Sequence, residues 1–425
     1  MHSNQLHHPP PSGRAAALGC FLILLCSFAP VQGQTLTLGQ VLSLLEGHNP
    51  TMAAARARQE SAQAAMVTAR MYPNPELETS GGTSTGIGPG SLNGPNEQLL
   101  VAQPLDLPFM REARRKVAEA GITSADEANR YVWLTVRAQA RQAFYEIIRR
   151  QSELQIAQDN ERLLSQIRDK VTLRVDVGEA PRYEQVKAEA EHLNAVKLRE
   201  SAIVRVEDAK SALRALFGPV LPRNFDAQGE LPATLSDLPT LETLRDEILA
   251  RQPALHQARA EVERAEAKLR LEEKSRWPVP TLITGVERDP GLEQWRVGFA
   301  LPLPIWNQRQ GPIGEARADL QQSEALANLQ ELTVLRELES AYNRYRIAQR
   351  QVETFESGLL RQAEATLKVA EAAYRLGERG ILDYLDAQRV FRSVRLDFLN
   401  ARFDRQAAVI DLERLRATEL KDIQP

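Results

Sequence analysis

The sequence predicts a mainly α-helical protein with a small β part, built as two tandem copies of one structural unit. Three observations predict this class. The same order of signals recurs about 200 positions later, so that Tyr72-Pro73-Asn74-Pro75 returns as Trp277-Pro278-Val279-Pro280. Long stretches have the Ala-, Glu-, Arg- and Leu-rich composition of coiled-coil helices. Short stretches of alternating apolar residues interrupt them, as strands do. The period is too long for a solenoid repeat, which favours one large duplicated unit.

Residues 1–33 have the features of a secretory signal peptide. One arginine precedes the apolar run 15–28, and small residues before Gln34 predict cleavage there. Both cysteines, Cys20 and Cys26, lie in this segment, so the mature chain needs no disulfide and offers no thiolate metal site. A lipid anchor on either is not expected, because both lie inside the apolar run and not at the cleavage site. We therefore expect an exported protein.

The composition of the remaining chain excludes several partners. The net charge is −3, and the 26% of charged residues interleave both signs along the expected helices, which is typical of solvated helix faces. We therefore expect no nucleic-acid partner. No later stretch has the ~18 apolar residues that a membrane-spanning helix needs. The exported chain is then soluble in the periplasm, secreted, or built into an outer membrane by strands.

The first copy is expected over residues 34–218. Two short helices come first, and the second ends at Tyr72 because the residue before a proline avoids the α region. A loop dense in Gly, Asn and Pro separates two strands, and two long helices follow. At 1.5 Å per residue the first long helix would measure about 100 Å, with Gly121 marking where a break would fall. The expected elements are helices 38–46 and 50–71, strands 75–84 and 97–107, and helices 109–177 and 181–216.

A proline-rich linker, 219–239, leads to the second copy at 240–419 and a tail at 420–425. Its strands are expected at 280–288 and 293–303, and its long helices at 313–376 and 381–418. In the last strand, four apolar residues alternate with small or polar ones such as Arg296 and Gly298, which predicts one apolar face that contacts lipid. The lipid-facing residues are Trp295, Val297, Phe299 and Leu301.

The apolar residues of the long helices are spaced as in a coiled-coil seam. Leu360, Ala363, Leu367 and Ala370 step by three and four, which packs helices side by side. The strands raise a different problem, because four strands cannot close a membrane barrel and open sheet edges are not tolerated in hydrocarbon. If the strands enter a membrane, several chains must share one barrel. The alternative is a soluble helical domain capped by two hairpins.

Several motifs together resemble the TolC-type outer-membrane factors, which are the exit ducts of tripartite efflux pumps. The resemblance spans the mature chain and rests on Leu38-Gly39-Gln40-Val41 with His48-Asn49-Pro50, on the strand exit from Gln103 to Pro108, and most specifically on the segment from Tyr374 to Gln388. The strand exit and the Met110–Arg114 segment after it resemble the CzcC-like heavy-metal branch of that family.

The resemblance implies a homotrimer. Three chains with four strands each would form one twelve-stranded barrel in outer-membrane lipid, and the long helices would form a tunnel across the periplasm. The implied partners are a periplasmic adaptor protein and an inner-membrane RND-type pump, which supply the energy. The duct would export metal cations or drugs passively. This fits the motifs, since no phosphate-binding loop, nucleophile elbow or zinc-binding helix occurs. We expect no enzyme activity, no cofactor and no resident metal.

The expected functional residues lie at the two helix–helix turns. In the family, acidic residues at the second turn ring the periplasmic mouth, and Asp383 and Asp386 match them. Being three apart, they share one helix face, and such a ring favours cations. Tyr374 and Arg379 match positions that tie neighbouring helices in the closed state, and Glu184 in the first copy matches a carboxylate partner. The simpler alternative is that the aspartates are helix-start charges.

Two other function classes remain open at this stage. A periplasmic coiled-coil adaptor would also be exported and helical, but it has one helical hairpin beside Gly- and Val-rich β domains. A secreted structural coiled coil would have no transport role. The two long hairpins and the scarcity of strands favour the outer-membrane duct over the adaptor.

Overall fold

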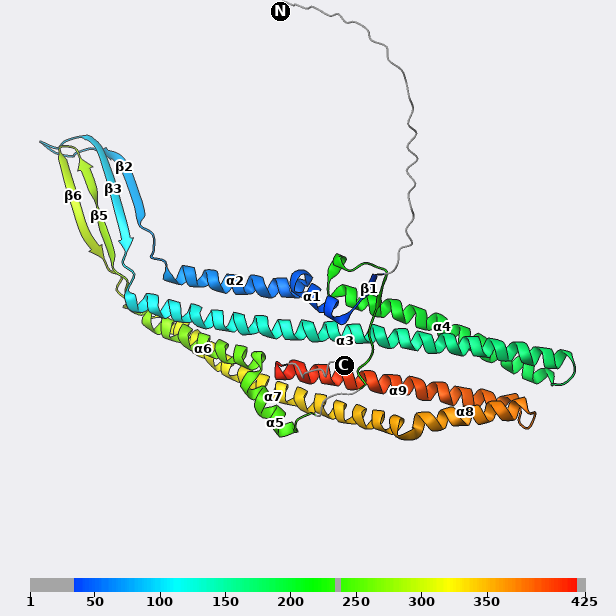
Figure 1. The fold of residues 1–425 in the computed structure, drawn as a ribbon. Helices are drawn as coiled ribbons and strands as arrows, with labels where there is room; N and C mark the ends of the chain where they lie inside the picture. Colours follow the sequence, from blue (N-terminus) through cyan, green and yellow to red (C-terminus); the bar gives the residue numbers. More distant parts are fainter. Residues whose placement is uncertain (1–33, 234–237, 419–425) are drawn as a thin grey trace, which may run out of the picture.

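The computed structural model describes residues 34–233 and 238–418 (Figure 1). The expected signal peptide and the tail 420–425 lie outside these residues. Long helices run side by side, with a four-stranded sheet at one end and two helical turns at the other (Figure 1). Within the described ranges, no helix has a stretch apolar enough to cross a membrane.

One helix, α3 (Pro108–Asp176), packs against helices of both copies. It has 69 residues and is therefore about 100 Å long. It runs through Gly121 without a break. On its first half pack α2 (Pro50–Arg70) and α6 (Pro253–Lys274), and on its second half α4 (Arg182–Ala215) and α9 (Ile381–Arg416).

The helices that pack along α3 form a wall. The two halves of this helical wall are joined through Asn49, which separates α1 (Leu38–His48) from α2. Its side chain is buried and accepts a hydrogen bond from the Met52 amide, which caps α2. Its amide nitrogen donates to the Leu216 carbonyl at the end of α4, at 2.7 Å. The start of α2 is thereby fixed to the end of α4, which explains the His48-Asn49-Pro50 motif.

The second copy follows the same plan, with one correction to the prediction. After α5 (Leu241–Arg251) and α6, the expected helix over 313–376 is not continuous. It consists of α7 (Gln310–Thr354), a five-residue π-helical segment called η2 (Phe355–Leu359), and α8 (Leu360–Arg375). Gly358 leaves the helical region, at φ 160° and ψ −18°. The wider hydrogen-bond pattern of η2 bends the helix, and π-helical bulges are common at functional positions.

The sheet contains β2 (Glu76–Ser84), β3 (Gly94–Pro104), β5 (Thr281–Asp289) and β6 (Leu292–Ala300), paired antiparallel in that order. Each copy supplies one hairpin, and β3 joins β5 at the centre. β6 ends three residues before the predicted 303 because Pro302 and Pro304 cannot donate to a strand ladder. β3 also lies earlier than the predicted 97–107. Leu105 then makes one more bond, to the Pro280 carbonyl at 2.8 Å.

A second, two-stranded sheet was not predicted. It pairs β1 (Gln34–Leu36) with β4 (Phe225–Ala227) in parallel, beside the short 3-10 helix η1 (Gly218–Val220). Phe225 and Phe217 are fully buried there against Phe144 of α3. The chain after β4 crosses the helices and is held by α9, since Arg402 donates to the Leu231 carbonyl. The linker is therefore an ordered strap over the described residues up to 233.

The sheet yields a prediction about two glycines on the same face. A Cβ on Gly285 would lie 2.1 Å from the Leu99 carbonyl oxygen, whereas one on Gly298 would meet nothing within 4 Å. We expect Gly285→Ala to separate β3 from β5 and to cost roughly 1–3 kcal/mol of stability. The midpoint of heat unfolding should fall for Gly285→Ala and stay unchanged for the matched control Gly298→Ala. Equal midpoints for the two variants would contradict this register.

Candidate functional site

Two turns of the same construction, α3–α4 and α8–α9, lie at the end of the helices far from the sheet, and we call this end the mouth (Figure 1). In the α3–α4 turn, Gly178 has φ 82°, and the Glu179 amide donates back to the Arg174 carbonyl at 2.8 Å. In the α8–α9 turn, Gly377 has φ 75°, and Glu378 donates to the Ala373 carbonyl at 3.0 Å. This left-handed cap requires glycine, which explains why the motif recurs.

Asp383 and Asp386 lie at the start of α9, on its exposed side. Each has an arginine nearby in sequence, in the turn before α9 for Asp383 and on α9 itself for Asp386. Arg379 lies 3.7 Å from Asp383, and Arg389 lies 3.6 Å from Asp386. The two carboxylate side chains are 57% and 67% exposed, so these ion pairs contribute little stability. Within the described chain, the ion pair of Arg379 is thus with Asp383.

Tyr374, at the end of α8, lies between the two helical hairpins. Its ring stacks on Tyr384 of α9, with centroids 5.9 Å apart and planes at 17°. On α3, the guanidinium carbon of Arg174 lies 5.4 Å from the same ring. The Tyr374 hydroxyl is buried without a hydrogen-bond partner, and so is one oxygen of Glu184. The structure thus brings Tyr374 against Arg174 and Tyr384 and does not join Tyr374 to Glu184 by a hydrogen bond.

The charges around this ring are fixed at neutral pH. Burial raises the pKa of Tyr384 to about 12, helped by Glu371 and Tyr374, so its hydroxyl stays protonated. The Tyr374 hydroxyl, and then the Glu184 and Glu179 carboxylates, raise the pKa of Arg174, which stays charged. The hydroxyl is close to Arg174 but not aligned for a hydrogen bond. We therefore describe the contact as a guanidinium beside an aromatic ring.

Sequence reasoning missed Arg174 and Tyr384. The signal for Arg174 is its place four residues before the turn glycine, where its main chain receives the bond that closes the cap. For Tyr384, the signal is its position among the apolar residues of the α9 seam, where it is 5% exposed. Neither signal distinguishes a residue that holds the mouth from one that only packs.

The apolar side chains of the sheet gather on one face. Directly paired residues share a face, so Val297 lies in one row with Thr284, Val101 and Leu77. Trp295, Val297 and Phe299 are 80%, 72% and 70% exposed, and Leu301 continues the series after the end of β6. The opposite face carries Arg296, which forms an ion pair with Glu287. The face of Val297 is thus apolar and unpacked along most of the single chain, and it carries an ion-paired arginine, Arg288, only near the β5–β6 turn.

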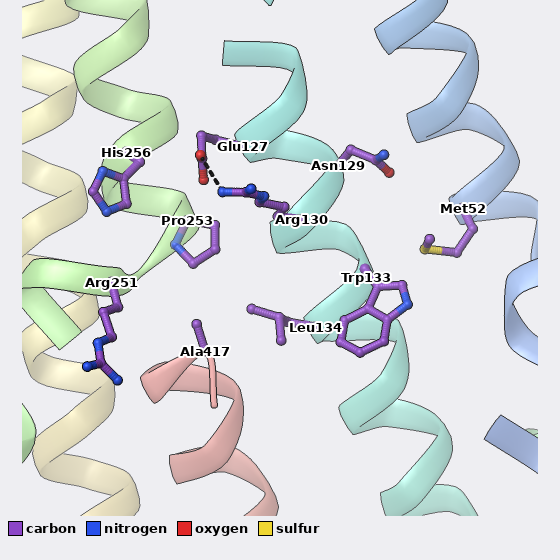
Figure 2. A pocket seen from close by; sticks show the side chains of 10 residues that line it. All are labelled: Met52, Glu127, Asn129, Arg130, Trp133, Leu134, Arg251, Pro253, His256 and Ala417. Carbon is purple, nitrogen blue, oxygen red and sulfur yellow. Dashed lines mark hydrogen bonds and ion pairs between the residues drawn. The ribbon is translucent and has the colours of Figure 1, made fainter. Parts of the chain in front are cut away.

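A cavity of about 610 Å³ lies halfway along the helices, where α6 begins (Figure 2). The ionisable side chains that line this cavity do not form a catalytic constellation. Glu127 is paired with Arg130 at 3.0 Å, and His256 lies 3.0 Å from the Ala250 carbonyl. Among the described residues, no group of three or more His, Cys, Asp or Glu side chains is arranged to hold a metal ion.

Comparison with known proteins identifies the family. The model of the outer membrane efflux protein family matches residues 41–219 and 244–418, one segment in each copy. The cobalt-zinc-cadmium resistance protein CzcC of Cupriavidus metallidurans is 30% identical over 387 residues, covering 89% of this chain and 90% of that protein. The chain belongs to the outer membrane efflux protein family.

Two further relatives agree with this assignment. The pyoverdine export outer membrane protein OpmQ of Pseudomonas putida is 24% identical over 384 residues, covering 83% of this chain and 79% of that protein. The CmeC outer membrane channel of Campylobacter jejuni has the same fold, with a TM-score of 0.79 at 16% identity over 91% of this chain and 87% of that one. The predicted TolC-like fold class is therefore confirmed.

Family membership settles the broad function. The chain is an outer-membrane efflux channel with a helical part in the periplasm, as predicted. The alternative of a periplasmic adaptor is not supported. Because the family consists of passive conduits, the expectation that the chain is not an enzyme is also confirmed.

Proposed function

We propose that the chain is one third of a homotrimeric exit duct for metal cations. The observation that carries this proposal is the incomplete sheet. Within the described residues, β2 and β6 each have one partner, so both outer edges of the sheet are unpaired. In hydrocarbon an unpaired edge costs several kcal/mol per backbone group, so a sheet that enters lipid has to close. Three copies with four strands each would close one twelve-stranded barrel.

The helices support the same assembly, because the outermost ones have exposed apolar side chains. On α7, Leu326, Leu329 and Leu332 are 55–66% exposed. On α4, at the opposite edge of the wall, Val186 and Leu193 are 62% and 58% exposed. Exposed apolar rows of this kind mark association surfaces. In a trimer, they would be covered by the next copy, so that the helical wall closes along with the sheet.

The size of the sheet fits a lipid bilayer. β5 and β6 have nine residues each, which at about 3.4 Å per residue gives a length of roughly 30 Å. Tilted by about 40°, such strands cover on the order of 23 Å, close to the ~25 Å apolar band of outer-membrane barrels. Trp295, Val297, Phe299 and Leu301 would face this lipid, and Arg296 would face the lumen.

Metal cations are the substrate class that we favour. The relative with 30% identity over nearly the whole chain is named for cobalt, zinc and cadmium resistance. The more distant relative is named for pyoverdine export, which makes an organic cargo the second candidate. A conduit should not bind its cargo tightly, and the scattered carboxylates of the described chain fit this requirement.

The energy for export would come from partners. We propose a periplasmic adaptor protein and an inner-membrane RND-type pump, with which the family relationship is compatible. The two turns at the periplasmic end are the natural contact point, because they are the part of the chain farthest from the sheet (Figure 1).

The mouth would act as a cation-selective gate. Around a threefold axis, Asp383 and Asp386 would gather six carboxylates around one narrow opening, and such rings attract cations. Arg379 and Tyr374 would hold the mouth closed, with Glu184 beside them. The ion pair of Arg379 with Asp383 supports this role, since the same arginine can neutralise the ring when the mouth is shut.

The lipid-facing assignment predicts opposite effects for two neighbouring substitutions. Val297→Arg places a charge against hydrocarbon and should cost ~2–4 kcal/mol near the membrane midplane. Gly298→Arg places the same charge toward the lumen and should be tolerated. The amount of assembled protein in the outer-membrane fraction should fall only for Val297→Arg. If Gly298→Arg fails and Val297→Arg assembles, the two faces are reversed.

The gate assignment predicts a loss of cation preference. Replacing both Asp383 and Asp386 with alanine removes the proposed carboxylate ring and should weaken cation selectivity and block by divalent cations, without changing assembly. The measurement is the reversal potential and the blocked current in planar lipid bilayers. Glu364→Ala is the matched control, because that carboxylate is paired with Lys368 on α8. Unchanged selectivity and block in the double variant would mean that the aspartates are ordinary helix-start charges.

The substrate assignment is tested in the native host. Deleting the gene should lower the concentrations of cobalt, zinc or cadmium salts that the cells tolerate, and the intact gene should restore them. Restoration should fail with Val297→Arg, which cannot assemble. Unchanged metal tolerance together with a lost export of an organic compound would favour the second candidate.

A further inference from the structure

Four helix ends meet at the mouth, and each contributes one side chain to a single cluster. Arg174 lies in the last turn of α3, Glu184 in the first turn of α4, Tyr374 in the last turn of α8 and Tyr384 near the start of α9. The Tyr374 ring has the guanidinium of Arg174 at 5.4 Å and the ring of Tyr384 at 5.9 Å. The electrostatic influence of Glu184 reaches Arg174 as well. The cluster therefore connects the α3–α4 hairpin to the α8–α9 hairpin.

Most other contacts between these hairpins near the mouth are apolar, apart from Gln388 of α9, whose amide nitrogen donates to Asn160 of α3 at 3.4 Å. Leu164, Ile167 and Val171 of α3 pack with Ile381 and Leu385 of α9 in one buried cluster, against which Tyr374 lies. Apolar packing of this kind is not directional and permits the hairpins to slide. A cation over a ring has a preferred position, so Arg174 supplies a directional contact in addition to the Gln388–Asn160 hydrogen bond, and it lies in the last turn of α3.

We propose that Arg174 and Tyr384 hold the Tyr374 ring between them and thereby fix the α8–α9 hairpin against the α3–α4 hairpin in the closed mouth. We call these three side chains the aromatic clasp. The proposal rests on the proposed gate and assigns it a residue, Arg174, that positions Tyr374. The part of Tyr374 that is held is the ring and not the hydroxyl.

Two observations favour the ring over the hydroxyl. The Tyr374 hydroxyl is buried and lies close to Arg174 without the geometry of a hydrogen bond, so removing it breaks no well-formed bond. The near-parallel stacking on Tyr384, at 17° between planes, uses the ring alone. Glu184 acts on Arg174 through its charge, which places the carboxylate one step away from Tyr374.

The clasp predicts an order among three variants in single-channel recordings. Arg174→Gln removes the cation and Tyr374→Leu removes the ring, so both should increase the open population. A cation–ring contact corresponds to roughly a 2- to 30-fold shift of the open–closed equilibrium per chain. Tyr374→Phe keeps the ring and should leave the conductance unchanged. Arg162→Gln is the matched control, because Arg162 is an exposed arginine of α3 with a local partner, Asp159.

Full-length protein reconstituted in planar bilayers is the material for each variant, and heat-modified mobility on gels confirms that it has assembled. If Tyr374→Phe opens the channel as much as Tyr374→Leu, the hydroxyl is the tie and the clasp is wrong. If Arg174→Gln behaves as Arg162→Gln, the clasp is also wrong. Should Tyr374→Leu fail to assemble, the comparison of Arg174→Gln with Tyr374→Phe still decides.

The outcome is separable from that of the gate itself. Replacing Asp383 and Asp386 tests the constriction through cation block, which the clasp variants leave in place when they only change the open population. A changed block with an unchanged Arg174→Gln channel would retain the gate and reject the clasp. An unchanged block in the aspartate variant with an opened Arg174→Gln channel would retain the clasp as a structural tie and reject the acidic constriction.

Discussion

The hydrogen-bonding requirement of the sheet edges constrains this whole molecule. A strand in hydrocarbon has no water to satisfy its amides and carbonyls, so both edges of the four-stranded sheet need a partner. One chain supplies β2-β3-β5-β6 and stops, with β2 and β6 each paired on one side within the described residues. The helical wall below has the same character, since its outer helices expose apolar rows. In the proposed trimer the chain is one segment of a closed barrel, and a single copy leaves both outer edges of its four-stranded sheet unpaired within the described residues.

Within one copy, α3 is the helix that holds the two repeats together. The long helix reaches from the sheet to the mouth and contacts helices of both repeats along the way (Figure 1). Two buried polar contacts fix the middle of the wall. Asn49 joins α2 to α4, and Arg141 of α3 forms a buried ion pair with Glu413 of α9. Removing one partner of such a pair is costly, because the other charge stays buried. Between these contacts and the mouth, η2 bends the helix from α7 to α8. The contacts toward the mouth are mostly apolar.

Much of this arrangement is predictable from the sequence. The absence of proline over some 70 residues predicts α3, and the alternation around Val297 predicts β6. Turn glycines at 178 and 377 predict the two mouth turns, because few other residues accept their backbone angles. The prediction fails where the signal is too short or too general. β1 and β4 have three residues each, fewer than an alternation pattern needs. η2 lies inside an apolar repeat that continues through it, so only Gly358 marks the place.

At the mouth, too, some residues are predictable from the sequence and others are not. Family resemblance points to Tyr374, Asp383 and Arg379, but not to Arg174 and Tyr384, which contact Tyr374. Arg174 is one of many arginines on the long helices, and its role depends on a meeting of four helix ends that no local pattern contains. Such contacts between distant segments are set by the packing of the whole wall. These contacts can be found only in the three-dimensional structure, whereas the helices, strands and turns can be predicted from the sequence.

The most direct test of this account is the mass of the assembled particle. The protein should be extracted from the outer membrane in mild detergent and weighed by native mass spectrometry. The account predicts three copies of the processed chain and a single species that dissociates only when the sheet unfolds. A monomer that retains its folded sheet in the membrane fraction would contradict it, because four strands would then be stable in lipid with both edges open.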